Sequence, residues 1–150
     1  MPIKESVSVL LIVYNEEKLI ERCLKSVVGV VDEIIVVHDG DCKDNTLSIA
    51  RKYTDKVYVE SHLGYPELHM IRALEYISCS WVLKLDADEY LSEDLRENLQ
   101  RLVNDERYSA YAFIWPIWDG SSYLSKDLPF KDVLFRTSDI CAEEIIPRTY

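Results

Sequence analysis

The strongest constraint on the fold of this chain is a regular alternation of short apolar runs with segments at helical spacing. The apolar runs cover residues 7–13, 33–38, 56–60 and 81–85. Apolar residues at helical spacing, typical of amphipathic helices, fill residues 16–28, 45–53, 67–77 and 93–104. Strands that alternate with helices predict a mostly parallel, right-handed, doubly wound sheet, so we predict an α/β fold.

Polar residues mark where the predicted helices begin. Asn15 is a candidate N-cap for the first helix, because two acidic residues follow it and complement the helix dipole. Asp44 or Asn45 can cap the second helix in the same way. A longer loop around residues 64–66 leads to the third helix.

The last third of the chain has a different pattern. Residues 108–118 are aromatic and contain Pro116, which predicts an edge strand or a bent strand, and residues 132–137 predict a further strand. We interpret residues 1–106 as one half of the fold and residues 107–150 as the start of a second half. The aromatic side chains of residues 108–118 either cover the sheet, which is the commoner case, or line a binding groove.

Length and charge restrict the class of protein. A chain of 150 residues suggests one domain, and its net charge of −10 argues against a broad nucleic-acid-binding surface, although a nucleotide ligand remains compatible. The N-terminus has no signal-peptide pattern, and the apolar run of residues 7–14 is too short to span a bilayer. Four scattered cysteines indicate reduced thiols, so we expect a cytoplasmic protein.

Acidic residues follow three of the predicted strands. Glu16 comes after the first strand, Asp39 after the second, and Asp86 and Asp88 after the strand of residues 81–85. In an open parallel sheet, ligands bind outside the carboxyl ends of the strands, where these side chains would meet. Asp86 and Asp88 are two residues apart and could face one divalent ion, for which oxygen ligands favour Mg²⁺ or Mn²⁺. Alternatively, the acidic turn only caps the helix that begins near Ser92.

Several common motifs are absent from the sequence. It has no G-x-x-x-x-G-K-[ST] and no G-x-G-x-x-G, so neither a P-loop nor a dinucleotide site is supported, and it has no H-E-x-x-H or G-x-S-x-G. The three histidines, His38, His62 and His69, have no metal-ligand spacing, which favours structural or surface roles. Any diphosphate bound here would therefore be held by a metal ion and side chains.

Four segments, in this order, resemble glycosyltransferase family 2. They are V-L-L-I-V-Y-N-E-E, D-E-I-I-V-V-H-D-G-D-C-K-D-N-T, I-R-A-L-E-Y and W-V-L-K-L-D-A-D-E. The resemblance covers roughly residues 5–105. It implies a nucleotide-sugar-dependent enzyme with the GT-A fold, a Rossmann-like three-layer α/β/α sandwich with a mostly parallel central sheet.

The resemblance also implies roles for individual residues. Tyr14 and Glu16 would lie beside the nucleoside of a UDP- or GDP-sugar, with Val13 contributing backbone contacts. Asp39 corresponds to the acidic residue of the family that hydrogen-bonds the base. The family often has D-D-G-S or D-S-G-S where this chain has His38 to Asp41, and this departure puts the contacts to the base and sugar in question.

The diphosphate and the metal would be bound by residues further along the chain. Arg72 corresponds to a basic position that meets the diphosphate, although a surface arginine is the alternative. Asp86 and Asp88 correspond to the D-x-D motif of the family and would be catalytic: Asp88 as the direct ligand of Mg²⁺ or Mn²⁺, and Asp86 nearer the ribose or the waters of the metal.

The resemblance leaves the acceptor side open. In inverting members a catalytic base deprotonates the acceptor hydroxyl, and Glu143 and Glu144 form the late acidic pair, for which a surface role is the commoner interpretation. A binding module that needs a further segment or partner is an alternative to the enzyme. A phosphatase of the haloacid dehalogenase group is disfavoured, because its D-x-D lies on an early strand and precedes a small residue where this chain has Tyr90.

The resemblance further suggests a role in the assembly of cell-surface polysaccharide or glycolipid. A glycan or lipid-linked acceptor would bring the protein to the inner face of the membrane as a peripheral protein. Exposed aromatic residues between positions 108 and 118 would offer an interface for a homodimer.

Overall fold

The computed structural model describes residues 4–123 and 130–140 as a mixed α/β fold. Its strands are β1 (Val7–Val13), β2 (Glu33–Asp39), β3 (Val57–Glu60), β4 (Trp81–Leu85), β5 (Ala110–Ile114) and β6 (Phe130–Arg136). Its α-helices are α1 (Ile20–Val27), α2 (Thr46–Ala50), α3 (Met70–Leu74) and α4 (Glu93–Val103). The 3₁₀ helices η1 (Pro66–His69) and η2 (Thr137–Asp139) complete the elements of the described residues.

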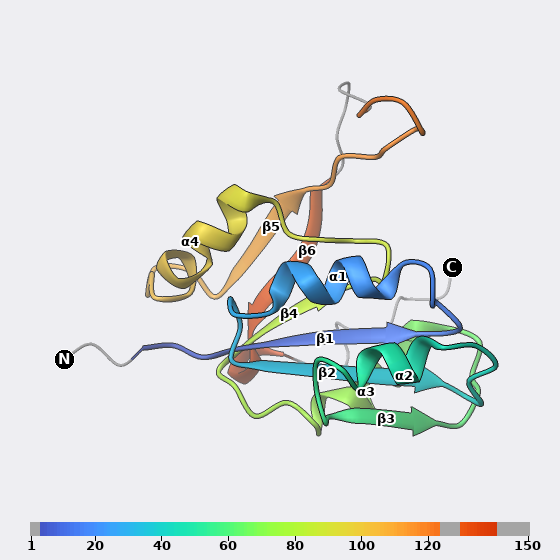
Figure 1. Cartoon of the computed structure of the whole chain (residues 1–150). Coiled ribbons are helices and arrows are strands. Elements are labelled where there is room, and N and C mark those ends of the chain that lie inside the picture. Colours follow the sequence, from blue (N-terminus) through green and yellow to red (C-terminus); the bar gives the residue numbers. More distant parts are fainter. Residues whose placement is uncertain (1–3, 124–129, 141–150) are drawn as a thin grey trace, which may run out of the picture.

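The strands form one six-stranded sheet in the order β3-β2-β1-β4-β6-β5. Strands β3, β2, β1 and β4 are mutually parallel, whereas β6 runs antiparallel to both β4 and β5. Figure 1 shows β1, β2 and β3 side by side with their arrowheads at the same edge. The predicted mostly parallel sheet is confirmed, and its parallel part places the carboxyl ends of four strands on one rim.

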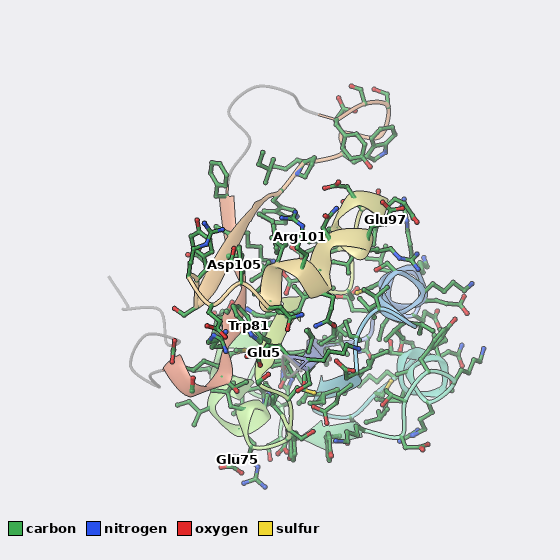
Figure 2. The ribbon with its side chains drawn as sticks, turned by 90° about the vertical axis from the view of Figure 1, so that its left-hand side faces the viewer. Glu5, Glu75, Trp81, Glu97, Arg101 and Asp105 are labelled. Atoms are coloured by element: carbon green, nitrogen blue, oxygen red, sulfur yellow. The ribbon has the colours of Figure 1, made fainter. Side chains whose placement is uncertain are left out.

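Helices cover both faces of the sheet. On one face, Val7, Val9 and Leu11 of β1 pack with apolar side chains of α1, α2 and α4. On the other face, Leu10 and Ile12 pack with α3. Strand β1 is buried along its whole length, which explains its nearly unbroken apolar run. Trp81 is fully buried. Figure 2 shows it between Glu97 of α4 and Glu75 beside α3, which lie on opposite sides of the molecule.

Three helices are shorter than the sequence pattern predicts. Helix α1 begins at Ile20 and not after Asn15, so the prediction of Asn15 as its N-cap was wrong. Asn15 has a φ of +50°, a left-handed conformation that asparagine tolerates, and a turn through Leu19 separates it from the helix. Helix α2 ends at Ala50, and the segment predicted as one helix over residues 67–77 is split into η1 and α3.

The aromatic segment forms an edge strand, as its sequence predicts. Strand β5 lies at the end of the sheet and stops before Pro116. Tyr111 and Phe113 pack against the core, whereas Tyr108, Trp115 and Trp118 are exposed. The interpretation of the aromatics as sheet cover therefore holds for one face of β5 and fails for the residues around it. None of the helices among the described residues is long and apolar enough to cross a membrane.

Candidate functional site

The carboxyl ends of β1, β2 and β4 bring the predicted site residues to one rim of the sheet. Val13 and His38 are register partners at the ends of β1 and β2, and β1 also pairs with β4. Burial raises the pKa of the Glu16 carboxyl, and the carboxylates of Asp88, Asp44 and Asp86 raise it further. Asp86 and Asp88 thus lie near enough to Glu16 to raise its pKa, which brings the three carboxylates to the same rim.

A short turn holds the acidic residues that follow β4. The backbone N–H of Asp86 donates to Glu89 Oε2 at 2.8 Å, and the N–H of Glu89 donates to the Asp86 carbonyl oxygen at 3.0 Å. The Lys131 ammonium on β6 donates to Asp86 Oδ2 at 2.7 Å and to Glu89 Oε1. Burial lowers the pKa of Lys131, but its hydrogen bonds to these two carboxylates outweigh burial and raise the pKa.

Asp88 differs from the other carboxylates of this turn. It is exposed, and its carboxylate has no hydrogen bond or ion pair with any of the residues that the structure describes. Asp86 and Glu89 have partners in the same turn or on β6. Asp88 is therefore the carboxylate of this turn with its oxygens available to a ligand.

The loop after β1 is held rigidly by the loop after β2. The N–H of Glu16 donates to Thr46 Oγ1 at 2.7 Å, and the N–H of Glu17 donates to Asp44 Oδ2 at 3.1 Å. Burial raises the pKa of Asp44, but hydrogen bonds from Thr46 and from the Glu17 amide outweigh it and lower the pKa to about 2. Asn15 in turn accepts a bond from the Lys43 N–H at 2.8 Å. The backbone at Glu16 is thus anchored to the loop after β2.

His38 explains one departure from the motif of the resembled family. Its ring is fully buried, and Nδ1 lies 2.8 Å from the Gly40 carbonyl oxygen, so Nδ1 carries the hydrogen and donates. Nε2 is then free to accept from the Asn15 N–H at 3.1 Å. His38 therefore supports the left-handed turn at Asn15, which confirms a structural role.

Asp39 is buried at the end of β2 and already has partners. Its carboxylate accepts from the backbone N–H groups of Leu63 (2.6 Å) and Gly64 (2.9 Å) and from His69 Nε2 (2.7 Å). Burial raises the pKa of Asp39, but these hydrogen bonds and the nearby His62 outweigh burial and lower it. The loop of residues 61–65 thus lies directly over Asp39, and a contact between Asp39 and a nucleotide base stays a prediction.

The approach of that loop depends on Gly40. This glycine has a φ of +82°, and a Cβ atom built there would lie 2.7 Å from Cβ of His62. The ring of His62 packs against the ring of Tyr14 in a tilted arrangement, with the two ring centroids 5.2 Å apart. Tyr14 is exposed, so its ring forms one side of an open surface beside Glu16.

Two predicted residues are placed elsewhere or lie outside the described residues. Arg72 is 62% exposed on α3, with Nε 3.6 Å from Glu60 and 3.9 Å from Glu75, so the structure pairs it with these carboxylates and not with Asp86 or Asp88. Its contact with a diphosphate stays a prediction. Glu143 and Glu144 lie outside the described residues.

Lys131 is a contact of the site that the sequence pattern did not single out, and it bonds to Asp86 and Glu89 of the acidic turn. Continuing the antiparallel register in which Leu83 faces Leu134 places Lys131 opposite Asp86. A lysine within an apolar strand was a signal of a buried partner, but the sequence contains no information on which strand β6 would join.

A cavity of about 600 Å³ lies at the opposite, amino end of the strands. Glu33 and Lys56 are among its lining residues and form an ion pair with each other. Because these charged groups already satisfy one another, this cavity has less to offer a charged ligand than the acidic rim. We therefore place the candidate site at the rim.

The carboxylates of the rim could hold a divalent cation only together with other ligands. Among residues 4–123 and 130–140, no group of three or more His, Cys, Asp or Glu side chains is arranged to enclose a metal. Mg²⁺ is commonly held by one or two carboxylates together with phosphate oxygens. Asp88, which has no partner within residues 4–123 and 130–140, and the second oxygen of Asp86 fit that arrangement, with a phosphate-bearing ligand supplying the other oxygens.

Comparison with known proteins identifies the family. The profile described as Glycosyl transferase family 2 matches residues 8–141. The chain belongs to glycosyltransferase family 2.

Two relatives illustrate this membership of family 2. An uncharacterized glycosyltransferase of Rickettsia conorii is 36% identical over 110 residues, which cover 71% of this chain and 38% of the relative. The lipopolysaccharide core biosynthesis glycosyltransferase LpsC of Rhizobium meliloti is 31% identical over 105 residues, covering 67% of this chain and 38% of LpsC. The chain thus spans about 38% of the length of these two relatives of family 2.

Solved structures share the GT-A fold of this family 2 chain. Residues 1–349 of S. aureus TarS in complex with UDP superpose with a TM-score of 0.66 and 21% identity, covering 89% of this chain and 47% of that TarS chain. The M. tuberculosis glucosyl-3-phosphoglycerate synthase in complex with Mn²⁺ and UDP-glucose gives a TM-score of 0.55 and 24% identity, covering 71% of this chain and 42% of the synthase. The predicted GT-A fold is confirmed.

Proposed function

We propose that this chain is the donor-binding part of a glycosyltransferase. It would bind a UDP- or GDP-sugar at the acidic rim and transfer the sugar to an acceptor hydroxyl. The observation that carries the proposal is the turn after β4, where Asp88 is exposed and unpartnered among the described residues while its neighbours are held in place. A ligand-binding carboxylate on a rigid support is what a donor site needs.

Different residues of the rim would bind the metal ion and the nucleoside of the donor. Asp88 would ligate a divalent cation directly, and Asp86 would contribute its remaining oxygen or hold the waters of the cation. When bound, Mg²⁺ or Mn²⁺ would offset the charge that develops on the departing nucleoside diphosphate. Tyr14, with Val13 and Glu16, would contact the nucleoside, because the exposed Tyr14 ring lies at the end of β1.

The reaction that these residues would support is an inverting transfer. The acceptor oxygen attacks the anomeric carbon, the bond from that carbon to the diphosphate oxygen breaks, and a base takes the acceptor proton. Glu143 and Glu144 are the candidates for that base, with a surface role as the commoner interpretation of the pair. A relative named for lipopolysaccharide core biosynthesis supports a glycan or lipid-linked acceptor. Such an acceptor would bring the protein to the inner face of the membrane.

A second candidate function is a nucleotide-sugar-binding module without catalysis of its own. The observation that favours it is that the chain spans about 38% of the length of the two relatives. In this case residues 107–150 begin an acceptor half that needs a further segment or a partner, such as a second copy of the chain.

Thermal stability with nucleotides tests the donor site. UDP, GDP, CDP and ADP are each added with Mn²⁺ and again with a chelator. A ligand at about a hundred times its dissociation constant stabilises a fold by roughly 2.7 kcal/mol, which is readily detected. We expect a Mn²⁺-dependent rise in Tm with UDP or GDP. No rise with any of the four nucleotides would reject the donor site, and binding without sugar transfer would favour the binding module.

A further inference from the structure

Lys131 places a positive charge inside the acidic rim. Its ammonium bonds to Asp86 Oδ2 at 2.7 Å and to Glu89, and its side chain is only 23% exposed. The ring centroid of Trp115 lies 4.7 Å from the same nitrogen, which adds a cation–π contact. Lys131 is therefore held in position by two carboxylates and one aromatic ring.

The ammonium covers part of the surface that a metal ion would use. Asp86 has one oxygen bonded to Lys131, and its backbone N–H is bonded to Glu89, so the turn is closed around the lysine. A divalent cation at Asp88 and Asp86 would lie near this ammonium and be repelled by it. A bound diphosphate, by contrast, would bring negative oxygens that attract both cations.

We propose that Lys131 is a built-in counter-ion that makes metal binding depend on the nucleotide. In the ligand-free protein it neutralises Asp86 and Glu89, and therefore weakens the binding of a divalent cation on its own. When a nucleoside diphosphate is present, its charge compensates for both the lysine and the metal. The inference rests on the proposed donor site and adds an order of assembly to it: the cation arrives with the donor or after it.

Two other roles for Lys131 lead to different results. A lysine that only pins β6 to the turn after β4 would affect stability and leave metal affinity unchanged. A lysine that only ligates the diphosphate would affect nucleotide affinity without changing the affinity for metal alone. The affinity for free metal in the absence of nucleotide is therefore the quantity that separates the three roles.

The test measures Mn²⁺ binding to the 150-residue chain by calorimetry, first without nucleotide and then with saturating UDP or GDP. Lys131→Met removes the charge, and Lys131→Gln removes the charge but keeps an N–H donor for Asp86, which supports the fold if methionine does not. Lys52→Met is the matched control, because Lys52 is exposed, has no ion pair among the described residues and changes the net charge equally.

We expect both Lys131 variants to bind Mn²⁺ alone about tenfold more tightly than the wild type, with Lys52→Met unchanged. The gain in Mn²⁺ affinity on adding nucleotide should shrink in the same two variants. If Lys131→Gln and Lys52→Met bind free Mn²⁺ equally, the counter-ion role is overturned. Failure of the wild type to bind any nucleotide with Mn²⁺ would instead reject the donor site, whatever the Lys131 variants do.

Discussion

The amino and carboxyl ends of the parallel sheet are both acidic, but they differ in whether their carboxylates are hydrogen-bonded. At the amino end, Glu33 is 9% exposed and accepts hydrogen bonds from the hydroxyl groups of Ser8 and Ser78, the Ser78 N–H and the Lys56 ammonium. At the carboxyl end, Asp88 is exposed with no such partner among the described residues. At one end a carboxylate joins neighbouring strands, and at the other a carboxylate is exposed to solvent.

The carboxylates at the two ends of the sheet also differ in the direction in which their pKa is shifted. Burial raises the pKa of Glu33, but the bonds from Lys56, Ser8 and Ser78 outweigh burial and lower it to about 2. The pKa of Glu16 at the carboxyl end is raised, first by burial and then by neighbouring carboxylates. Ionised Glu33 therefore stabilises the fold, whereas ionised Glu16 destabilises it until a cation binds nearby.

The largest expected effect is at the carboxyl end. Asp88→Asn should remove most of the Mn²⁺-dependent stabilisation by UDP or GDP, roughly 2.7 kcal/mol at about a hundred times the dissociation constant. The ligand-free protein should unfold at an unchanged or slightly higher temperature, because one carboxylate leaves a repulsive cluster. Thermal unfolding with and without Mn²⁺ measures both quantities.

Asp94→Asn is the control for that measurement. Asp94 is exposed in the first turn of α4 and lies outside the rim loops, so its substitution should leave the nucleotide response intact. An Asp88→Asn protein that keeps the full Mn²⁺-dependent shift would remove Asp88 from the donor site.

The next effect concerns the amino end. Glu33→Gln should lower the free energy of unfolding by about 2 kcal/mol, because it removes the charge that Lys56 and the two serines pair with. This loss is at the low end for breaking a buried ion pair, because the Lys56 side chain is 43% exposed and water screens the pair. Urea unfolding measures the change.

Nucleotide binding should be unaffected by Glu33→Gln, and the exposed Glu106→Gln should change stability by less than about 0.5 kcal/mol. Equal stabilities for Glu33→Gln and Glu106→Gln would contradict the structural role of the amino-end network.

The pH dependence of stability offers a third test. The pKa of Glu33 is about 2 in the folded protein and near 4.3 in an unfolded chain, so its contribution is present above pH 5 and lost as the pH falls towards 2. Over that window the wild type should lose about 2 kcal/mol more than Glu33→Gln. Parallel stability curves for the two proteins would show that Glu33 is not the titrating group.

The smallest effect has the opposite sign. Since the folded pKa of Glu16 is raised, its charge costs stability at neutral pH, and Glu16→Gln should stabilise the ligand-free protein by up to about 0.5 kcal/mol. The same Glu-to-Gln change thus destabilises one end of the sheet and stabilises the other. Urea unfolding at pH 7 with and without Mn²⁺ checks this, and a destabilised Glu16→Gln would contradict the electrostatic assignment.

The sequence pattern predicted the strands more accurately than the helices. Strand β1 matches the apolar run of residues 7–13, because burial on both faces leaves a strong local signal. The start of α1 was missed, because the left-handed turn at Asn15 depends on His38 and Lys43 from a later segment. Such contacts between distant residues leave no periodic pattern in the chain.

The candidate site shows the same division. The clustering of Glu16, Asp86 and Asp88 followed from the rule that parallel strands end at one rim, which requires only the order of strands and helices. The partners of Asp39 did not follow, since Leu63, Gly64 and His69 reach it from a loop and a 3₁₀ helix whose path is not encoded by hydrophobic spacing.

By itself, the sequence determined the α/β class, the acidic rim and the family, because hydrophobic period and short motifs are local properties of a chain. Only the tertiary structure decided that Lys131 faces Asp86, and that Glu33 has hydrogen-bond partners whereas Asp88 has none among the residues that the structure describes. Those facts depend on the antiparallel pairing of β6 with β4 and on contacts between segments far apart in the chain. The sequence shows which residues carry a carboxylate, but the tertiary structure determines which group each carboxylate contacts.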